Sequence, residues 1–156
     1  MEPLHILPTK LYIPPSRPET VIRHHLLSLI NDNFRLKTIL VAAPAGFGKT
    51  TLVCNFIRQL NTPVAWFSIS EGDNEAVIFF SYLISALQTI DPGIGESILP
   101  MLQSPQSDYR LVLTNLIQDL DQRDVEMVLV LDETPFRLLT SLEGVVCGKG
   151  STKRRT

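Results

Sequence analysis

The pattern of hydrophobic and polar positions predicts three buried strands separated by amphipathic helices. Three short, almost wholly apolar runs of strand-forming residues occupy positions 38–42, 64–68 and 127–131. Strands of this kind are covered on both faces, as in a parallel sheet. Apolar residues at helical spacing predict helices over residues 19–30, 48–60, 75–90, 94–102 and 108–122. This alternation predicts an α/β fold: an incomplete parallel sheet with flanking helices.

The residues before the first strand form a separate region. Prolines at positions 3, 8, 14, 15 and 18 exclude a long helix and favour an extended arm, which one helix then follows. We therefore divide the chain into an N-terminal arm and helix (residues 1–34), a partial α/β domain (35–133) and an atypical tail (134–156).

Composition restricts the class of protein. With 156 residues, 44% of them hydrophobic, the chain is long enough to bury one core. No run approaches the roughly 20 apolar residues of a membrane span, and the first residues do not resemble a secretory signal. Cys54 and Cys147 lie far apart, which argues against a disulfide framework or a zinc knuckle. We expect a cytoplasmic protein that does not contact a membrane.

Charge is unevenly distributed along the chain. The tail, residues 134–156, holds five of the 14 basic residues and only one acidic residue, Glu143. A basic arm for nucleic acid is one interpretation, and a solvated terminus is the more ordinary one. No aromatic-plus-basic stripe and no helix-turn-helix pattern supports the first interpretation, so we expect no DNA contact from this chain.

A candidate phosphate-binding loop joins the first strand to the helix that follows it. Residues 43–50 match GxxxxGK[ST], except that Ala43 replaces the first glycine. Glycines allow the backbone N–H groups to turn inward around phosphate oxygens, next to the positive end of a helix dipole. Lys49 would pair with the β- and γ-phosphates, and the Thr50 hydroxyl would bind Mg²⁺. The predicted nucleotide-binding residues are Ala43, Pro44, Ala45, Gly46, Phe47, Gly48, Lys49, Thr50 and Thr51.

The third strand ends in two acidic residues, Asp132 and Glu133. A carboxylate at the carboxyl end of a strand beside a phosphate loop can hold the hydration shell of Mg²⁺. We therefore predict Asp132 and Thr50 as metal-site residues, and Asp132 and Glu133 as catalytic ones, with Glu133 polarising an attacking water. A strand that simply ends in a polar turn is the alternative. The phosphate loop about 80 residues upstream favours the metal site.

Three blocks of the sequence resemble a known family: KLYIPPSRPETVIRHHLLSLI, AAPAGFGKTTL and VAWFSISEGDNEAVIFFSYLISALQ. Together they are similar to the start of MalT-like, large LuxR-family transcriptional activators, which are signal-transducing P-loop NTPases. The resemblance implies that Lys49 and Thr50 bind ATP and Mg²⁺, that Asp132 belongs to the second nucleotide motif, and that Arg23 lies near the nucleotide.

The resemblance ends after Glu133. It implies a sheet order 5-1-4-3-2, in which a fourth strand separates the strands at 38–42 and 127–131. We expect that strand to be absent, because residues 134–156 resemble a frameshifted or truncated tail. Unpaired edges of these two strands would then promote self-association. DNA binding belongs to a C-terminal domain of the family that these residues do not contain.

The sequence thus predicts an ATP-binding portion of a regulator in which the nucleotide acts as a switch, with efficient hydrolysis not expected. The alternatives are a stand-alone P-loop enzyme, such as a small-molecule kinase, and a non-functional remnant.

Overall fold

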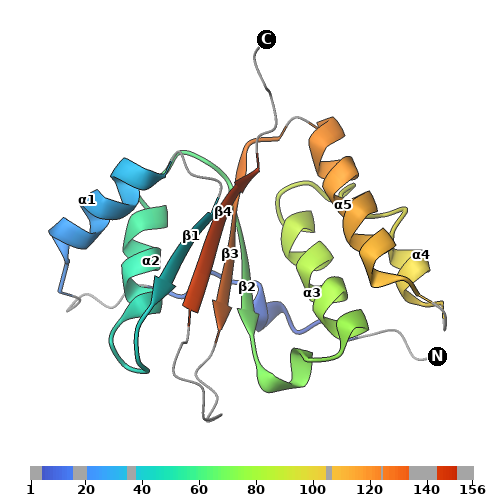
Figure 1. Cartoon of the computed structure of the whole chain (residues 1–156), viewed down its shortest axis with the longest axis horizontal. Coiled ribbons are helices and arrows are strands. Elements are labelled where there is room, and N and C mark those ends of the chain that lie inside the picture. Colours follow the sequence, from blue (N-terminus) through green and yellow to red (C-terminus); the bar gives the residue numbers. More distant parts are fainter. Residues whose placement is uncertain are drawn as a thin grey trace.

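The computed structural model describes residues 5–15, 21–34, 38–104, 107–123 and 125–133, together with the backbone of 144–150. It confirms the α/β fold, with helices on both sides of a small sheet (Figure 1). Its elements are η1 (Pro8–Lys10), α1 (His24–Asn33), β1 (Thr38–Ala42), α2 (Lys49–Ile57), β2 (Val64–Ile69), η2 (Glu71–Asp73), α3 (Ala76–Gln88), α4 (Leu99–Leu102), α5 (Tyr109–Arg123), β3 (Met127–Glu133) and β4 (Gly144–Gly150).

The sheet has the order β1-β4-β3-β2. Strands β2 and β3 are parallel, with Ser68 opposite Asp132. Strand β4 lies between β1 and β3 and is antiparallel to both. Because β1, β2 and β3 all run in one direction, their carboxyl ends share one edge of the sheet, where ligands of open α/β sheets bind.

The prediction for the tail is therefore wrong in part. We expected residues 134–156 to contribute no strand, whereas residues 144–150 fill the gap between the first and third predicted strands. Strand β3 is paired on both sides as a result, and β1 and β2 form the two edges of the described sheet. We had predicted unpaired edges on β1 and β3, and only the outer edge of β1 is unpaired in the described sheet. Self-association through that edge stays a prediction. The remaining tail residues, including the basic run 153–155, lie outside the described residues.

Two apolar clusters cover the two faces of the sheet. On one face, α2 and α1 enclose a cluster that contains Phe56, Trp66 and Val130 (Figure 1). On the other face, α3, α4 and α5 enclose a larger cluster around Phe67, Ile84 and other side chains that are fully buried. The sheet is thus the middle layer of three, and the phosphate-loop helix α2 belongs to the layer that contains α1.

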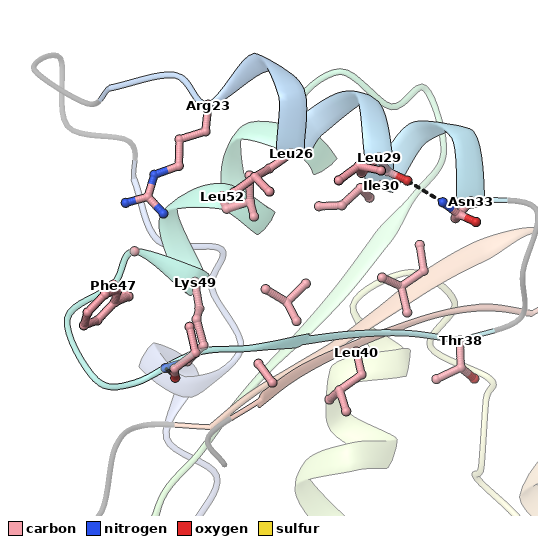
Figure 2. A pocket seen from close by; sticks show the side chains of 15 residues that line it. Arg23, Leu26, Leu29, Ile30, Asn33, Thr38, Leu40, Phe47, Lys49 and Leu52 are labelled. Atoms are coloured by element: carbon pink, nitrogen blue, oxygen red, sulfur yellow. Dashed lines mark hydrogen bonds between the residues drawn. The ribbon is translucent and has the colours of Figure 1, made fainter. Parts of the chain in front are cut away.

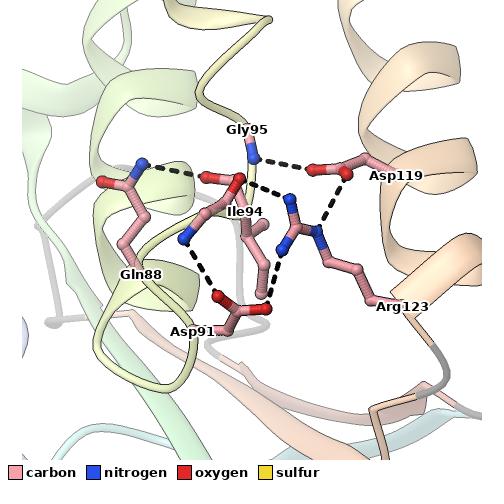
Figure 3. A network of polar contacts seen from close by, with 7 residues as sticks. Gln88, Asp91, Ile94, Gly95, Asp119 and Arg123 are labelled. Atoms are coloured by element: carbon pink, nitrogen blue, oxygen red, sulfur yellow. Dashed lines mark hydrogen bonds and ion pairs between the residues drawn. The ribbon is translucent and has the colours of Figure 1, made fainter.

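A polar network fixes the connection between α3 and α5 (Figure 3). Arg123 donates to Asp91 at 2.7 Å, to Asp119 at 2.9 Å and to the Gly93 carbonyl at 2.6 Å. Asp119 also accepts from the Gly95 N–H at 2.7 Å.

The predicted helix over 94–102 is shorter in the structure, where only Leu99–Leu102 is α-helical. Gly95 has a φ of +72°, which an α-helix does not contain.

The N-terminal arm is docked by specific contacts where it is described. Element η1 packs beside β2, and Ile6 and Leu11 join the apolar cluster of the α3 face. Helix α1 begins at His24, with Arg23 as its N-cap. The segment 16–20, in which we expected this helix to begin, lies outside the described residues.

Candidate functional site

The loop between β1 and α2 has the backbone that a phosphate-binding loop requires. Gly46 and Gly48 both have φ of +80°, a conformation that residues with a β-carbon rarely adopt. Gly48 is the N-cap of α2, so the first N–H groups of this nine-residue helix face the loop. The positive end of the helix dipole therefore coincides with the concave side of the loop.

Lys49 is the first residue of α2 and is only 8% exposed. Its ammonium group donates to the carbonyl of Ala43 at 2.7 Å and to that of Pro44 at 3.3 Å. The positive charge is thus held inside the loop by the loop's own backbone. A phosphate oxygen that enters the loop would replace a neutral carbonyl with an anionic partner, which forms a stronger, charge-assisted hydrogen bond.

Thr50 and Asp132 meet although they are 82 residues apart in sequence. The Thr50 hydroxyl donates to both carboxylate oxygens of Asp132, at 2.9 and 3.1 Å. One residue comes from the first turn of α2 and the other from the end of β3. These are the oxygen donors that Mg²⁺ prefers when it binds one protein carboxylate together with substrate phosphates, so their chemistry fits the metal.

Asp132 is buried, with 7% of its surface exposed. Burial raises the pKa of its carboxyl group, and the hydrogen bond from Thr50 and the charge of Lys49 oppose that shift without cancelling it. Burial therefore disfavours the ionised form. A divalent cation held by Asp132 would favour that form again.

Cys54 lies one helical turn after Thr50 and is a buried free thiol. Burial, followed by the negative charge of Asp132, raises the pKa of this thiol to about 11. The thiolate form needed for nucleophilic or redox chemistry is therefore scarce at neutral pH. Cys54 is a packing residue of α2.

The remaining predicted residues occupy different positions around the loop. Thr51 is exposed on the first turn of α2, and Ala45, Gly46 and Phe47 are exposed at the loop tip. Glu133 is exposed at the end of β3 and, because side chains alternate along a strand, points to the face opposite Asp132. The role of Glu133 in polarising an attacking water stays a prediction.

Two depressions flank the loop and share Arg23, Gly48 and Leu52. The larger, of about 480 Å³, lies between α1 and β1 and is lined mainly by apolar side chains of these two elements (Figure 2). The smaller, of about 140 Å³, adds Val21, Thr51 and Asn55. A guanidinium nitrogen of Arg23 lies 3.9 Å from the place a β-carbon on Gly48 would occupy. Arg23 is therefore beside the loop, and its proximity to a nucleotide stays a prediction.

A second polar cluster lies at the end of β2, and the sequence analysis did not identify it. Ser70 and Asp73 form a capping box around η2. Lys10 of the N-terminal arm joins them, with its ammonium group 2.6 and 2.7 Å from the Asp73 carboxylate oxygens and 2.7 Å from the Ser70 hydroxyl. Only the fold shows that Lys10 belongs here, because no local pattern links residues 63 positions apart.

Some features were not found in the described part of the chain. It contains no group of three or more histidine, cysteine, aspartate or glutamate residues placed to hold a metal ion by themselves. Within the same residues, no helix is both long enough and apolar enough to cross a membrane. A metal at Asp132 would thus take its other ligands from the Thr50 hydroxyl, phosphate and water.

Comparison with known proteins finds relatives of part of this chain. The chain is 34% identical, over 117 residues, to proteins named serine/threonine-protein kinase PknK from two strains of Mycobacterium tuberculosis and from Mycobacterium bovis. The match covers 72% of this chain but only 10% of each relative, so the chain spans about a tenth of their length. No family model matches the chain.

Proposed function

We propose that this chain binds ATP with Mg²⁺ and is the nucleotide-binding portion of a MalT-like, LuxR-family transcriptional regulator. The hydrogen bond between Thr50 and Asp132 carries the proposal, because it joins the two motif residues that a metal–nucleotide complex requires. The left-handed glycines of the loop and the buried position of Lys49 support it. The similarity to large bacterial proteins over 72% of the chain agrees with a regulatory module inside a longer polypeptide.

In this proposal the nucleotide acts as a switch. Contacts of the γ-phosphate would favour one of two arrangements of the loop and its neighbours, and those arrangements would be read by other parts of the longer protein. Glu133 points to the face of the sheet opposite Asp132, and the described residues that line the two depressions include no carboxylate to orient an attacking water. Slow hydrolysis is therefore expected, as suits a switch.

Calorimetric titration of Mg·ATP tests the site, with Lys49→Met as the main variant. The methionine keeps the apolar stem of the lysine and removes a charge-assisted phosphate contact worth about 1.5–3 kcal/mol, so affinity should fall at least ~10-fold. Arg110→Ala is the matched control, because it removes one positive charge from an exposed position on α5, in the helical layer on the opposite side of the sheet from α2. Equal affinity of wild type and Lys49→Met refutes the assignment.

Tripolyphosphate tests the phosphate part of the site alone. Because the Arg23 guanidinium lies beside Gly48 of the loop, Arg23→Ala should weaken binding of both ATP and tripolyphosphate. Transfer of phosphate from ATP to a small-molecule acceptor would instead favour a stand-alone P-loop kinase, which is the alternative function.

A further inference from the structure

Strand β4 is the only described strand that connects the two halves of the site. The phosphate loop follows β1, and Asp132 ends β3, but in the described sheet these two strands pair only through β4. Val145 lies opposite Val41 on one side and opposite Asp132 on the other. The next residue, Val146, lies opposite Leu40 and Leu131. The register of β1 relative to β3 is therefore set through β4.

The apolar contacts of the site do not set this register by themselves. Val53 and Phe56 of α2 belong to the same buried cluster as Val128 and Val130 of β3, which holds the helix against the sheet. Such burial is non-directional and tolerates small displacements. The bonds from Thr50 to Asp132, at 2.9 and 3.1 Å, do not tolerate them, because hydrogen bonds weaken steeply outside a narrow range of distance and angle.

The phosphate loop itself has no such requirement. Its glycines, its lysine and the start of α2 all lie within residues 43–52, directly after β1. The ammonium of Lys49 is held by carbonyls of the same loop. The two halves of the site thus differ in what they need: the phosphate half is local in sequence, whereas the metal half is assembled across the sheet.

We propose that residues 144–150 are the positioning strand of the metal half of this site. Strand β4 holds Thr50 and Asp132 in register and so controls the Mg²⁺-dependent part of nucleotide affinity, while Mg²⁺-free binding to the phosphate loop does not require it. This inference rests on the proposed function, and it assigns a role to a segment outside the blocks that resemble the regulator family.

The test measures ATP affinity twice for each variant, once with Mg²⁺ and once with EDTA. Val146→Pro removes a ladder donor from a central strand, a position that proline does not tolerate. Val146→Ile is the matched control, because it keeps a β-branched side chain that suits a strand. Fluorescence of the single tryptophan, Trp66, which is buried in β2, reports whether each variant is folded.

For Val146→Pro we expect the ratio of affinities with and without Mg²⁺ to fall to about one, with Mg²⁺-free affinity almost unchanged. The wild-type ratio should persist in Val146→Ile. An unchanged ratio in folded Val146→Pro overturns the role of β4 and leaves the proposed function intact. Wild-type protein that binds ATP in neither buffer overturns the proposed function itself, and this inference with it.

A second measurement on the wild type decides the matter if Val146→Pro does not fold. Hydrogen exchange is compared for ATP with Mg²⁺ and for ATP with EDTA. If β4 couples the two halves, Mg²⁺ should slow exchange of amides in residues 144–150 as well as in the loop, because binding a metal between Thr50 and Asp132 suppresses local opening of the strand. Protection confined to the loop and α2 overturns the inference.

Discussion

The ion pair between Lys10 of the N-terminal arm and Asp73 of η2 should contribute more to stability than an exposed ion pair does. Its atoms lie 2.6 Å apart, and the two side chains are only 18% and 2% exposed. Removing one partner of a buried pair costs about 3–5 kcal/mol, whereas exposed pairs contribute below about 1 kcal/mol. Lys10 retains some contact with water, and Asp73 keeps two bonds from Ser70, so we expect Lys10→Met to cost about 2–3 kcal/mol.

The assay is urea unfolding followed by the fluorescence of Trp66, with Lys10→Met, Asp73→Asn and the double variant forming a cycle. A loss of about 2–3 kcal/mol corresponds to a melting temperature lower by about 4–12 °C in a chain of this size. The double variant should lose less than the sum of the single losses, because neither charge is then left buried alone. Arg110→Met is the control for removing an exposed positive charge.

The same pair predicts a pH dependence. Burial alone would raise the pKa of Asp73, but hydrogen bonds from Lys10 and Ser70 lower it below its ordinary value of 3.8. The pair therefore stabilises the folded state above that value, and the stabilisation is lost as pH falls through the lower pKa of the native state. A cost for Lys10→Met below about 0.5 kcal/mol at pH 7, or one independent of pH down to complete unfolding, refutes this account of the pair.

Two further predictions concern other buried positions. Because burial raises the pKa of Asp132, this carboxyl stabilises the fold below its ordinary pKa of 3.8 and loses that effect as pH rises through the native pKa. Asp132→Asn should therefore have a higher melting temperature than wild type at pH 7 without Mg²⁺, and it should lose the Mg²⁺ enhancement of ATP binding. A lower melting temperature would contradict this. Gly95→Ala should cost about 1–3 kcal/mol in urea unfolding, because its φ is +72° and a β-carbon would lie 2.8 Å from Ile84. Gly93→Ala is the matched comparison without a left-handed backbone. Its β-carbon would lie 2.8 Å from the Arg123 guanidinium and would disturb the partly exposed pair with Asp91, so it should cost less; equal costs would argue against backbone strain at Gly95.

Several elements could be predicted from the sequence because their signals are local. The run at residues 38–42 has no polar residue after Thr38, and the structure places β1 over the same residues. Helix α2 begins at Lys49, as the glycines before it indicate. Strand β4 could not be predicted in this way, because residues 144–150 include three glycines, which are poor strand formers. Its strand conformation depends on hydrogen bonding to β1 and β3, which only the assembled sheet supplies.

The site shows the same division between local and long-range information. Gly46, Gly48 and Lys49 are adjacent in sequence and fit a pattern whose physical purpose is known, so the phosphate loop could be predicted in detail. The acidic pair at 132–133 predicted that a carboxylate lies near the loop. Side chains alternate along a strand, so only one of the two can point toward Thr50, and the structure shows that it is Asp132. Lys10 could not be predicted, because its partner is 63 residues away.

The unequal burial of the two faces suggests how ligand binding and folding are connected. The cluster beneath α3, α4 and α5 contains seven residues with exposures of 0–1%, including Phe67 and Ile84, and does not involve the phosphate loop. The cluster beneath α1 and α2 is less completely buried, and β1 alternates between exposed and half-buried residues. Local opening should therefore begin at β1 and α1, next to the loop. A nucleotide that binds only the closed loop would stabilise this weaker half in proportion to its affinity, so ATP would act on the part of the fold best able to change.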